Sequence, residues 1–230
     1  MTTSAVLPLW STSIGKKAVM AVTGFLLFGF VVGHMLGNLK VYQGEAKFNA
    51  YAAWLREAGG PVLGHEQLLW VARVILLAAT ALHVTAAVQL TQMSYAARPV
   101  RYGKKRAIEA TYASRTMRWG GVIITLFVIY HLLHFTLGAV GFAPGQYASM
   151  SVYRNVVNGF SAWSVSAFYI AAMVALGLHM YHGVWSMFQT LGVNTAGGDP
   201  VFRGVAIVSS LAVVLGNISI PVSVLAGLVR

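Results

Sequence analysis

The sequence predicts an all-α integral membrane protein that forms one bundle of five transmembrane helices. The chain is 57% hydrophobic and only 9% charged, whereas about 25% of residues are charged in an ordinary soluble domain. At least five apolar runs reach the roughly 20 residues that a helix needs to cross a bilayer. Four of these runs also carry a histidine well inside the apolar stretch, at His34, His83, His131 and His179.

The five spans are joined by polar connections, so residues 1–230 are expected to form a single domain. From the apolar runs we place the spans at residues 18–39, 68–92, 117–140, 167–188 and 204–229. The first span follows Lys16 and Lys17, and the second and third flank a basic connection. The fourth follows a connection in which Arg154 is the single charge, and the fifth carries no histidine.

The connection between the first two spans contains one further predicted helix, residues 46–57. Phe48, Tyr51, Ala52 and Leu55 fall on one stripe of this helix. An amphipathic helix of this kind lies on the membrane surface or packs as an ordinary loop helix on the bundle. The sequence favours neither position.

The distribution of basic residues predicts the orientation of the bundle. Six of them stand against Glu109 alone between the second and third spans: Arg98, Arg101, Lys104, Lys105, Arg106 and Arg115. By the positive-inside rule, the amino terminus and this connection are cytoplasmic, and the carboxyl terminus lies outside the cell inner (plasma) membrane. The formal charge of +11 therefore indicates contact with membrane lipid and not with nucleic acid.

The four intramembrane histidines sort into two pairs by depth. Ionisable side chains are expensive at bilayer depth, so they indicate a functional site. At 1.5 Å per residue, His83 and His179 both lie about 14 Å from the cytoplasmic ends of their spans, whereas His34 and His131 lie about 24 and 21 Å in. Two imidazoles on different helices at one depth have the arrangement that ligates a haem iron from both faces. The alternative for any single histidine is a core residue bonded to a neighbouring carbonyl.

The depth pairing extends the predicted fold class to a five-helix bundle enclosing two haems. His83 and His179 would hold the inner haem iron, and His34 and His131 the outer one. The chain has no cysteine, which excludes thiolate ligation, covalent c-type attachment and cysteine-bound clusters within this chain. The haems would therefore be b-type.

Two further histidines complicate the ligand assignment. His134 and His182 each stand three residues after a proposed ligand and could share its helix face. At about 9 Å, the depth of His182 matches His83 less well than that of His179 does. Depth does not separate His131 from His134. We favour a supporting or quinone-site role for both additional histidines.

Charged residues near the span ends have two interpretations each. Arg73 near the outer face either pairs with a propionate of the outer haem or snorkels to the interface. Arg115 and Arg118 would meet inner-haem propionates or steer a soluble partner. Glu66, beside His65, is a candidate proton carrier for an outer quinone site or an ordinary helix-start glutamate. A competing quinone site would lie at the cytoplasmic end, near Ser13, Arg115, Arg118 and His182.

Several stretches resemble the cytochrome b membrane anchor of succinate:quinone oxidoreductases, of the single-subunit, five-helix, two-haem type that also serves fumarate reductases. The matching stretches are residues 13–24 (SIGKKAVMAVTG), 33–38 (GHMLGN), 130–131 (YH) and 179–186 (HMYHGVWS), with a weaker match at 81–83 (ALH). The resemblance implies the same ligand pairs as the depth argument and selects His131 over His134. It also implies a flavoprotein with covalent FAD and an iron–sulfur subunit docked on the cytoplasmic face, with quinone as substrate.

By this resemblance, the chain would be the non-flavin electron-transfer subunit of a succinate dehydrogenase (complex II), with the dicarboxylate active site in a partner subunit. The alternatives are the anchor of a fumarate reductase or of another quinone-linked dehydrogenase, such as a formate dehydrogenase or hydrogenase complex. A proton-coupled transporter would require carboxylates at mid-membrane, and no Asp or Glu falls inside a predicted span. Association of complexes into a higher oligomer stays open.

Overall fold

The structure, a computed structural model, describes residues 9–97, 112–195 and 197–230. This described part is all-helical and contains no strand. Five helices are long and apolar enough to cross a membrane. They are α1 (Ser13–Asn38), α3 (Gln67–Ala96), α4 (Tyr112–His131), α6 (Trp163–Thr190) and α7 (Asp199–Leu225). The expected all-α chain with five helices of membrane-spanning length and hydropathy is thereby confirmed.

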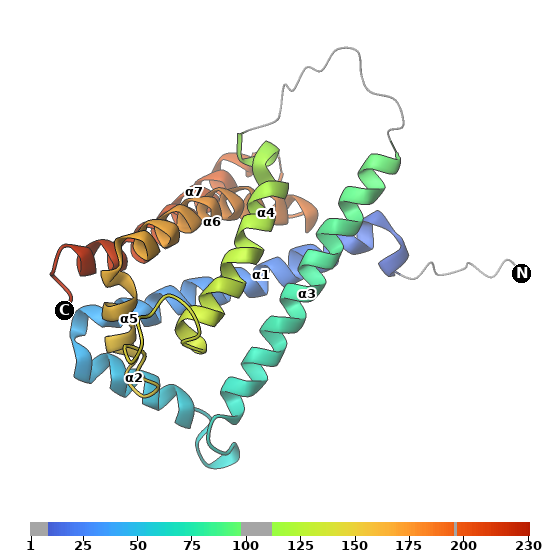
Figure 1. The fold of residues 1–230 in the computed structure, drawn as a ribbon. Coiled ribbons are helices and arrows are strands. Elements are labelled where there is room, and N and C mark those ends of the chain that lie inside the picture. Colours follow the sequence, from blue (N-terminus) through green and yellow to red (C-terminus); the bar gives the residue numbers. More distant parts are fainter. Residues whose placement is uncertain (1–8, 98–111, 196) are drawn as a thin grey trace, which may run out of the picture.

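The remaining elements are short and connect these helices. They are the 3-10 turns η1 (Leu9–Ser11), η2 (Leu39–Gln43) and η3 (Gly60–Val62), the π-turn η4 (Leu132–Thr136), and the helices α2 (Glu45–Glu57) and α5 (Val152–Ser161). Figure 1 shows α2 and α5 together at the end of the bundle where α1 stops. We call this end the α2–α5 end, and the opposite end, where α1 begins, the Lys16 end.

Helix α2 packs against α5 and η2, on the bundle. Phe48, on the predicted apolar stripe, is only 5% exposed and belongs to the main hydrophobic core. The structure therefore favours the bundle-packed alternative for this helix. The same core contains Phe127, Phe160 and Tyr169, which places the best-packed part of the molecule at the α2–α5 end.

Local capping chemistry moves three helix boundaries away from the predicted spans. Helix α1 begins before residue 18 because the Thr12 side chain accepts a hydrogen bond from the Gly15 N–H (2.9 Å). Helix α7 begins at Asp199, with Pro200 in its first turn. It ends at Leu225 and not at residue 229, because Gly227 adopts φ +71° and closes a Schellman cap.

The third span was predicted to end at residue 140, but it ends earlier in the structure. The α-helical part stops at His131, and the π-turn η4 carries the chain only to Thr136. Gly138 and Gly141 then take φ +62° and +79°, a left-handed conformation that glycine adopts without steric cost. The chain consequently leaves the helix axis before residue 140.

The long helices pack in the order α3–α1–α6–α4, and α7 lies along α6. Figure 1 shows α6 and α7 side by side on one flank and α3 on the other. Neither α1 with α4 nor α3 with α6 packs closely along its length in the described part of the chain. The space between these non-neighbouring helices is where the histidines lie.

Candidate functional site

The first histidine pair joins α1 to α4 near the α2–α5 end. The ring centroids of His34 and His131 are 5.8 Å apart, and the rings are nearly perpendicular, at 89°. Phe30 stacks on His34 at 5.3 Å. Phe127 and Phe135, one turn either side of His131, contact its ring at 5.8 Å each. The pair therefore lies in aromatic and apolar surroundings.

The second pair joins α3 to α6 in the middle of both helices. The ring centroids of His83 and His179 are 6.4 Å apart, with the rings inclined at 62°. The structure thus brings together both pairs that the depth argument predicted. It also brings each pair together across helices that are not packing neighbours, so only side chains span the two gaps.

The separation within each pair fits two ligands of one metal ion. An imidazole nitrogen binds a metal at about 2.0–2.1 Å. Two such nitrogens on opposite sides of one ion are about 4 Å apart, which puts the ring centroids at about 6 Å. The observed 5.8 and 6.4 Å lie close to this value. Two protein ligands are the number that a haem iron takes when the macrocycle supplies the other four.

The distance between the two histidine pairs can be estimated from the rise per residue along α1 and along α4. On α1, Thr23 contacts His83 and His34 follows eleven residues later, a rise of about 16 Å. On α4, Gly121 lies beside His179 and His131 follows ten residues later, a rise of about 15 Å. Both estimates agree. Two sites at this spacing divide a hydrocarbon core about 30 Å thick.

The hydroxyl of Thr23 determines which nitrogen of His83 carries the proton. Thr23 Oγ1 donates to the Val19 carbonyl at 2.7 Å, so its single proton is already used. We therefore assign its contact with His83 Nδ1 at 3.1 Å as a hydrogen bond donated by the imidazole, which also has the Met20 backbone carbonyl as an acceptor. This leaves Nε2 unprotonated, as metal ligation requires. Histidines that ligate metals are commonly held by such a bond from the other nitrogen.

Glycines bring the backbone close to the rings of the second pair. A Cβ at Gly24 would stand 3.3 Å from His83 Cε1, and one at Gly121 would stand 3.8 Å from His179 Cε1. Because Gly24 has no side chain, nothing at this position of α1 crowds the His83 ring. The Nδ1 atom of His179 is buried and has no hydrogen-bond partner within the described structure.

The surroundings of His134 differ from those of His131. His134 is fully buried, and a Cβ at Gly141 or Gly159 would stand 2.8 or 2.9 Å from its Nε2. The π-turn holds more residues per turn than an α-helix, so His134 is rotated further from His131 than three residues of α-helix would place it. Both imidazoles still reach one partner, because their Nδ1 atoms lie 3.3 and 2.9 Å from the Tyr169 hydroxyl. Only His131 faces His34.

The arginines predicted to contact haem propionates either have other partners or lie outside the described residues. Arg73 is exposed and its guanidinium lies 4.8 Å from the Trp70 ring centre, which favours the interfacial interpretation. Arg118 is exposed, donates to the Tyr95 hydroxyl at 2.8 Å and lies over that ring. Residues 98–106 of the basic connection and the side chain of Arg115 lie outside the described part.

Glu66 lies at the α2–α5 end in a cluster of ionisable side chains. Its carboxylate is 3.2 Å from Arg56 Nε, and its N–H donates to the Arg56 carbonyl at 2.7 Å. His65 lies beside it and contacts Glu57 at 2.6 Å. Glu66 takes φ +59°, which costs a non-glycine residue of order 1–2 kcal/mol. Its carboxylate therefore pairs with Arg56 and, at 3.9 Å, with His65 Nε2, whereas Arg73 is engaged by Trp70.

At the Lys16 end, His182 is half-buried and its ring lies 6.0 Å from that of Trp185. Trp185 Nε1 donates to Asp199 Oδ1 at 2.9 Å, and Arg203 Nε lies 2.5 Å from Oδ2 of the same carboxylate. Asp199 is the first residue of α7, so this carboxylate lies at a span end and not at mid-membrane. Ser13 begins α1 at the same end and is exposed.

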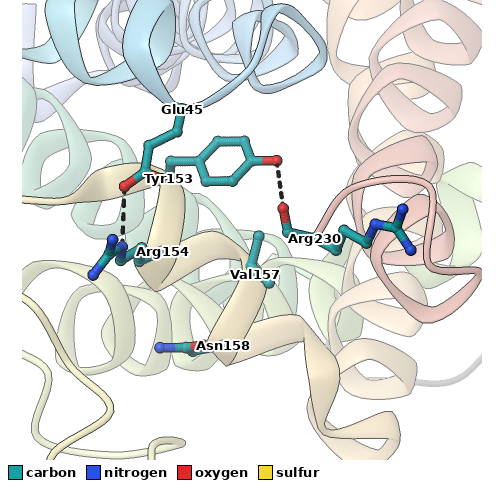
Figure 2. Close-up of a pocket in the computed structure, with 6 residues that line it drawn as sticks. All are labelled: Glu45, Tyr153, Arg154, Val157, Asn158 and Arg230. Atoms are coloured by element: carbon teal, nitrogen blue, oxygen red, sulfur yellow. Dashed lines mark hydrogen bonds and ion pairs between the residues drawn. The ribbon is translucent and has the colours of Figure 1, made fainter.

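A hollow of about 270 Å³ opens at the α2–α5 end, away from the histidine pairs. It is lined by Glu45, Tyr153, Arg154, Val157, Asn158 and Arg230. Figure 2 shows two pairs among its lining residues, Glu45 with Arg154 and Tyr153 with Arg230. Arg154 Nε lies 3.0 Å from the Glu45 carboxylate, and the Tyr153 hydroxyl donates to the Arg230 carbonyl at 3.1 Å. None of the predicted ligands lines it.

Sequence reasoning missed the residues that support the histidines, chiefly Thr23, Gly24, Gly121 and Tyr169. Thr23 and Gly24 stand in a stretch that carries the family resemblance, which was the one available signal. Tyr169 is a tyrosine inside an apolar run, and nothing in its spacing points to the histidines of α4.

No family model, no curated protein and no solved structure matches this chain.

Proposed function

We propose that this chain is the membrane-anchor cytochrome b subunit of a succinate dehydrogenase (succinate:quinone oxidoreductase, complex II). The observation that carries the proposal is the presence of two facing imidazole pairs, His34 with His131 and His83 with His179, about 15 Å apart along one bundle. When bound, two b-type haems would supply one-electron carriers stacked across the membrane between an iron–sulfur subunit and quinone.

The chain's own residues bind and orient the two groups. Each imidazole pair would hold one haem iron from two helices that are held apart by their neighbours. Thr23 keeps the proton of His83 on Nδ1 and so leaves Nε2 as the ligand atom. His34 is exposed, and His83, His131 and His179 are half-buried, so a bound haem would cover part of each imidazole.

In this proposal the Lys16 end is cytoplasmic and the carboxyl terminus lies outside the plasma membrane. The flavoprotein and iron–sulfur subunits, which contain the FAD, the clusters and the dicarboxylate site, dock at the Lys16 end. The described basic residues there are Lys16, Lys17, Arg118 and Arg203. Positive charge at a docking face would complement acidic groups of a partner.

We place quinone at the α2–α5 end, where Glu66 is the candidate proton carrier. Its carboxylate is partly exposed and is held by Arg56 in a strained turn. Backbone strain at a polar residue is a frequent feature of functional sites. If quinone binds on the side away from the iron–sulfur subunit, electrons must cross the membrane, and two haems would carry them.

The decisive experiment is a pyridine haemochrome assay on the purified chain, combined with identification of the co-purifying subunits. Two haems per polypeptide and a flavoprotein with succinate-oxidising activity are the expected result. A value near one haem would leave one histidine pair as a structural pair, and a value near zero would overturn the proposal. Co-purification of formate dehydrogenase or hydrogenase subunits would assign the chain to that complex instead.

A further inference from the structure

A buried tyrosine connects the outer histidine pair to the additional histidine of α4. Tyr169, on α6, is 5% exposed. Its hydroxyl lies 3.3 Å from His131 Nδ1 and 2.9 Å from His134 Nδ1. One hydroxyl therefore contacts both imidazoles, and it contacts each on the same ring nitrogen. Of these three hydrogen-bonded residues, only His131 belongs to the ligand pairs described above.

The number of protons available determines which group donates in each of these two hydrogen bonds. A tyrosine hydroxyl donates one hydrogen bond and accepts others, and a neutral imidazole carries one proton on one of its nitrogens. If His131 ligates through Nε2, its proton is on Nδ1 and it donates to Tyr169. The Tyr169 proton is then free to be donated to His134 Nδ1. His134 then carries its own proton on Nε2, which is buried and has no hydrogen-bond partner within the described residues.

The packing holds all three groups in this arrangement. The Tyr169 ring is flanked by Phe127 and Phe160, each at 5.0 Å. The His134 ring contacts Phe135 at 4.1 Å. Its Nε2 lies against the backbone of Gly141 and Gly159, which leaves no space there for a further ligand. The hydroxyl and the two imidazoles thus have few alternative positions.

We infer that Tyr169 and His134 are positioning residues for His131, and that they tune the outer haem through the hydrogen bond that His131 donates. The inference rests on the proposed function. A hydrogen bond donated by a ligating histidine fixes its tautomer and raises its basicity as a ligand. A more basic ligand stabilises the oxidised iron, so the bond lowers the reduction potential of the outer haem.

The inner pair has a different arrangement, which makes it an internal reference. There, the proton of the supporting hydroxyl goes from Thr23 to the Val19 carbonyl, and the chain of hydrogen bonds ends at the helix backbone. At the outer pair, the chain ends at a second imidazole. Removing the Tyr169 hydroxyl therefore changes the outer site alone.

The test is a spectroelectrochemical titration of purified Tyr169→Phe in which the two haems are resolved. We expect the outer potential to rise by an amount equivalent to about tenfold in the oxidation equilibrium, which is about 59 mV for one electron. The inner potential should stay at its wild-type value. Tyr42→Phe is the matched control, because Tyr42 also loses hydroxyl bonds at the α2–α5 end, to Ser219 (2.9 Å) and Ser223 (3.0 Å).

Substitutions of His134 give a second, independent measurement. His134→Leu removes the acceptor of the Tyr169 proton and should shift the outer potential in the same direction. His134→Asn places an amide oxygen near the position of Nδ1 and should restore a value close to wild type. This pair decides the question if Tyr169→Phe does not assemble.

Three outcomes overturn the inference. They are an unchanged outer potential in Tyr169→Phe, equal shifts of both haems, and equal effects of the two His134 variants. Wild-type protein that binds no haem would overturn the proposed function instead, so the two failures are distinguishable.

Discussion

The backbone of Gly24 on α1 faces the ring of His83 on α3, with little room for a side chain between them. A Cβ built on Gly24 stands 3.3 Å from Cε1 and 3.7 Å from Nδ1 of that imidazole. The first distance is tighter than most Cβ contacts and the second is ordinary van der Waals contact, so a methyl group here would shift the ring or the helices by a few tenths of an ångström. The position of the proposed inner ligand thus depends on a residue of another helix.

We expect Gly24→Ala to reduce inner-haem occupancy and to destabilise the bundle by about 1–3 kcal/mol, the usual cost of overpacking. Haem content and thermal unfolding of the purified variant measure the two effects. Gly29→Ala is the control, because Gly29 lies on the same helix with nothing within 4 Å of its Cβ position. Equal haem loss in both variants would show that α1 tolerates no added methyl group, and that the His83 contact is not the cause.

The bond from His83 to Thr23 leads to a prediction about haem retention. Thr23→Val keeps the side-chain volume but removes one of the two acceptors near the imidazole, leaving only the Met20 backbone carbonyl. Loss of such a supporting bond typically weakens metal binding by about 10–100-fold, so the inner haem should dissociate more readily in competition with apomyoglobin. Thr80→Val loses a comparable hydroxyl bond, to Leu76 at 2.8 Å, and should behave as wild type. Equal retention in both variants would contradict the role of Thr23.

The ligand assignment predicts which haem each histidine substitution removes. His34→Ala and His131→Ala should lose the outer haem only, whereas His83→Ala and His179→Ala should lose the inner one. His134→Asn should retain both, because His134 Nε2 is enclosed by Gly141 and Gly159. Haem stoichiometry and low-temperature spectra distinguish the two haems. Loss of a haem from His134→Asn, with both retained in His131→Ala, would reverse the assignment in α4.

The sequence alone predicted the five long helices and the two histidine pairs, because apolar length and the rise per residue convert directly into span and depth. It did not predict the π-turn after His131, since an extra residue in a turn has no composition signal and depends on the fit of His134 among Tyr169, Gly141 and Gly159. For the same reason, the pairing of His83 with Thr23 was not predictable, because it depends on which helix faces meet.

The ends of the spans were predicted less well than their centres. Hydropathy alone does not register that Asp199 and Pro200 can begin a helix or that Gly227 ends one. The partner of Glu66 was also missed. Arg56 is ten residues away in sequence, and the turn that brings it to Glu66 requires a left-handed backbone at a non-glycine residue.

Quinone chemistry at the α2–α5 end is tested by Glu66→Gln. The amide removes the ionisable proton carrier, while its oxygen still accepts a hydrogen bond from Arg56 and the side chain keeps its size. We expect quinone turnover to fall by about 100-fold or more, within the range that a positioned acid–base group contributes. Both haems, and succinate oxidation with an artificial acceptor, should be unaffected.

The control for this prediction is Glu57→Gln, which changes a neighbouring exposed carboxylate that contacts His65 at 2.6 Å. This variant should turn over quinone at the wild-type rate, because Glu57 is not held in the strained turn at the start of α3. Reduction of a membrane-soluble quinone, followed optically, measures both variants. Wild-type turnover in Glu66→Gln would move the quinone site to the Lys16 end, where Ser13, Arg118 and His182 lie, and electrons would then need only the inner haem.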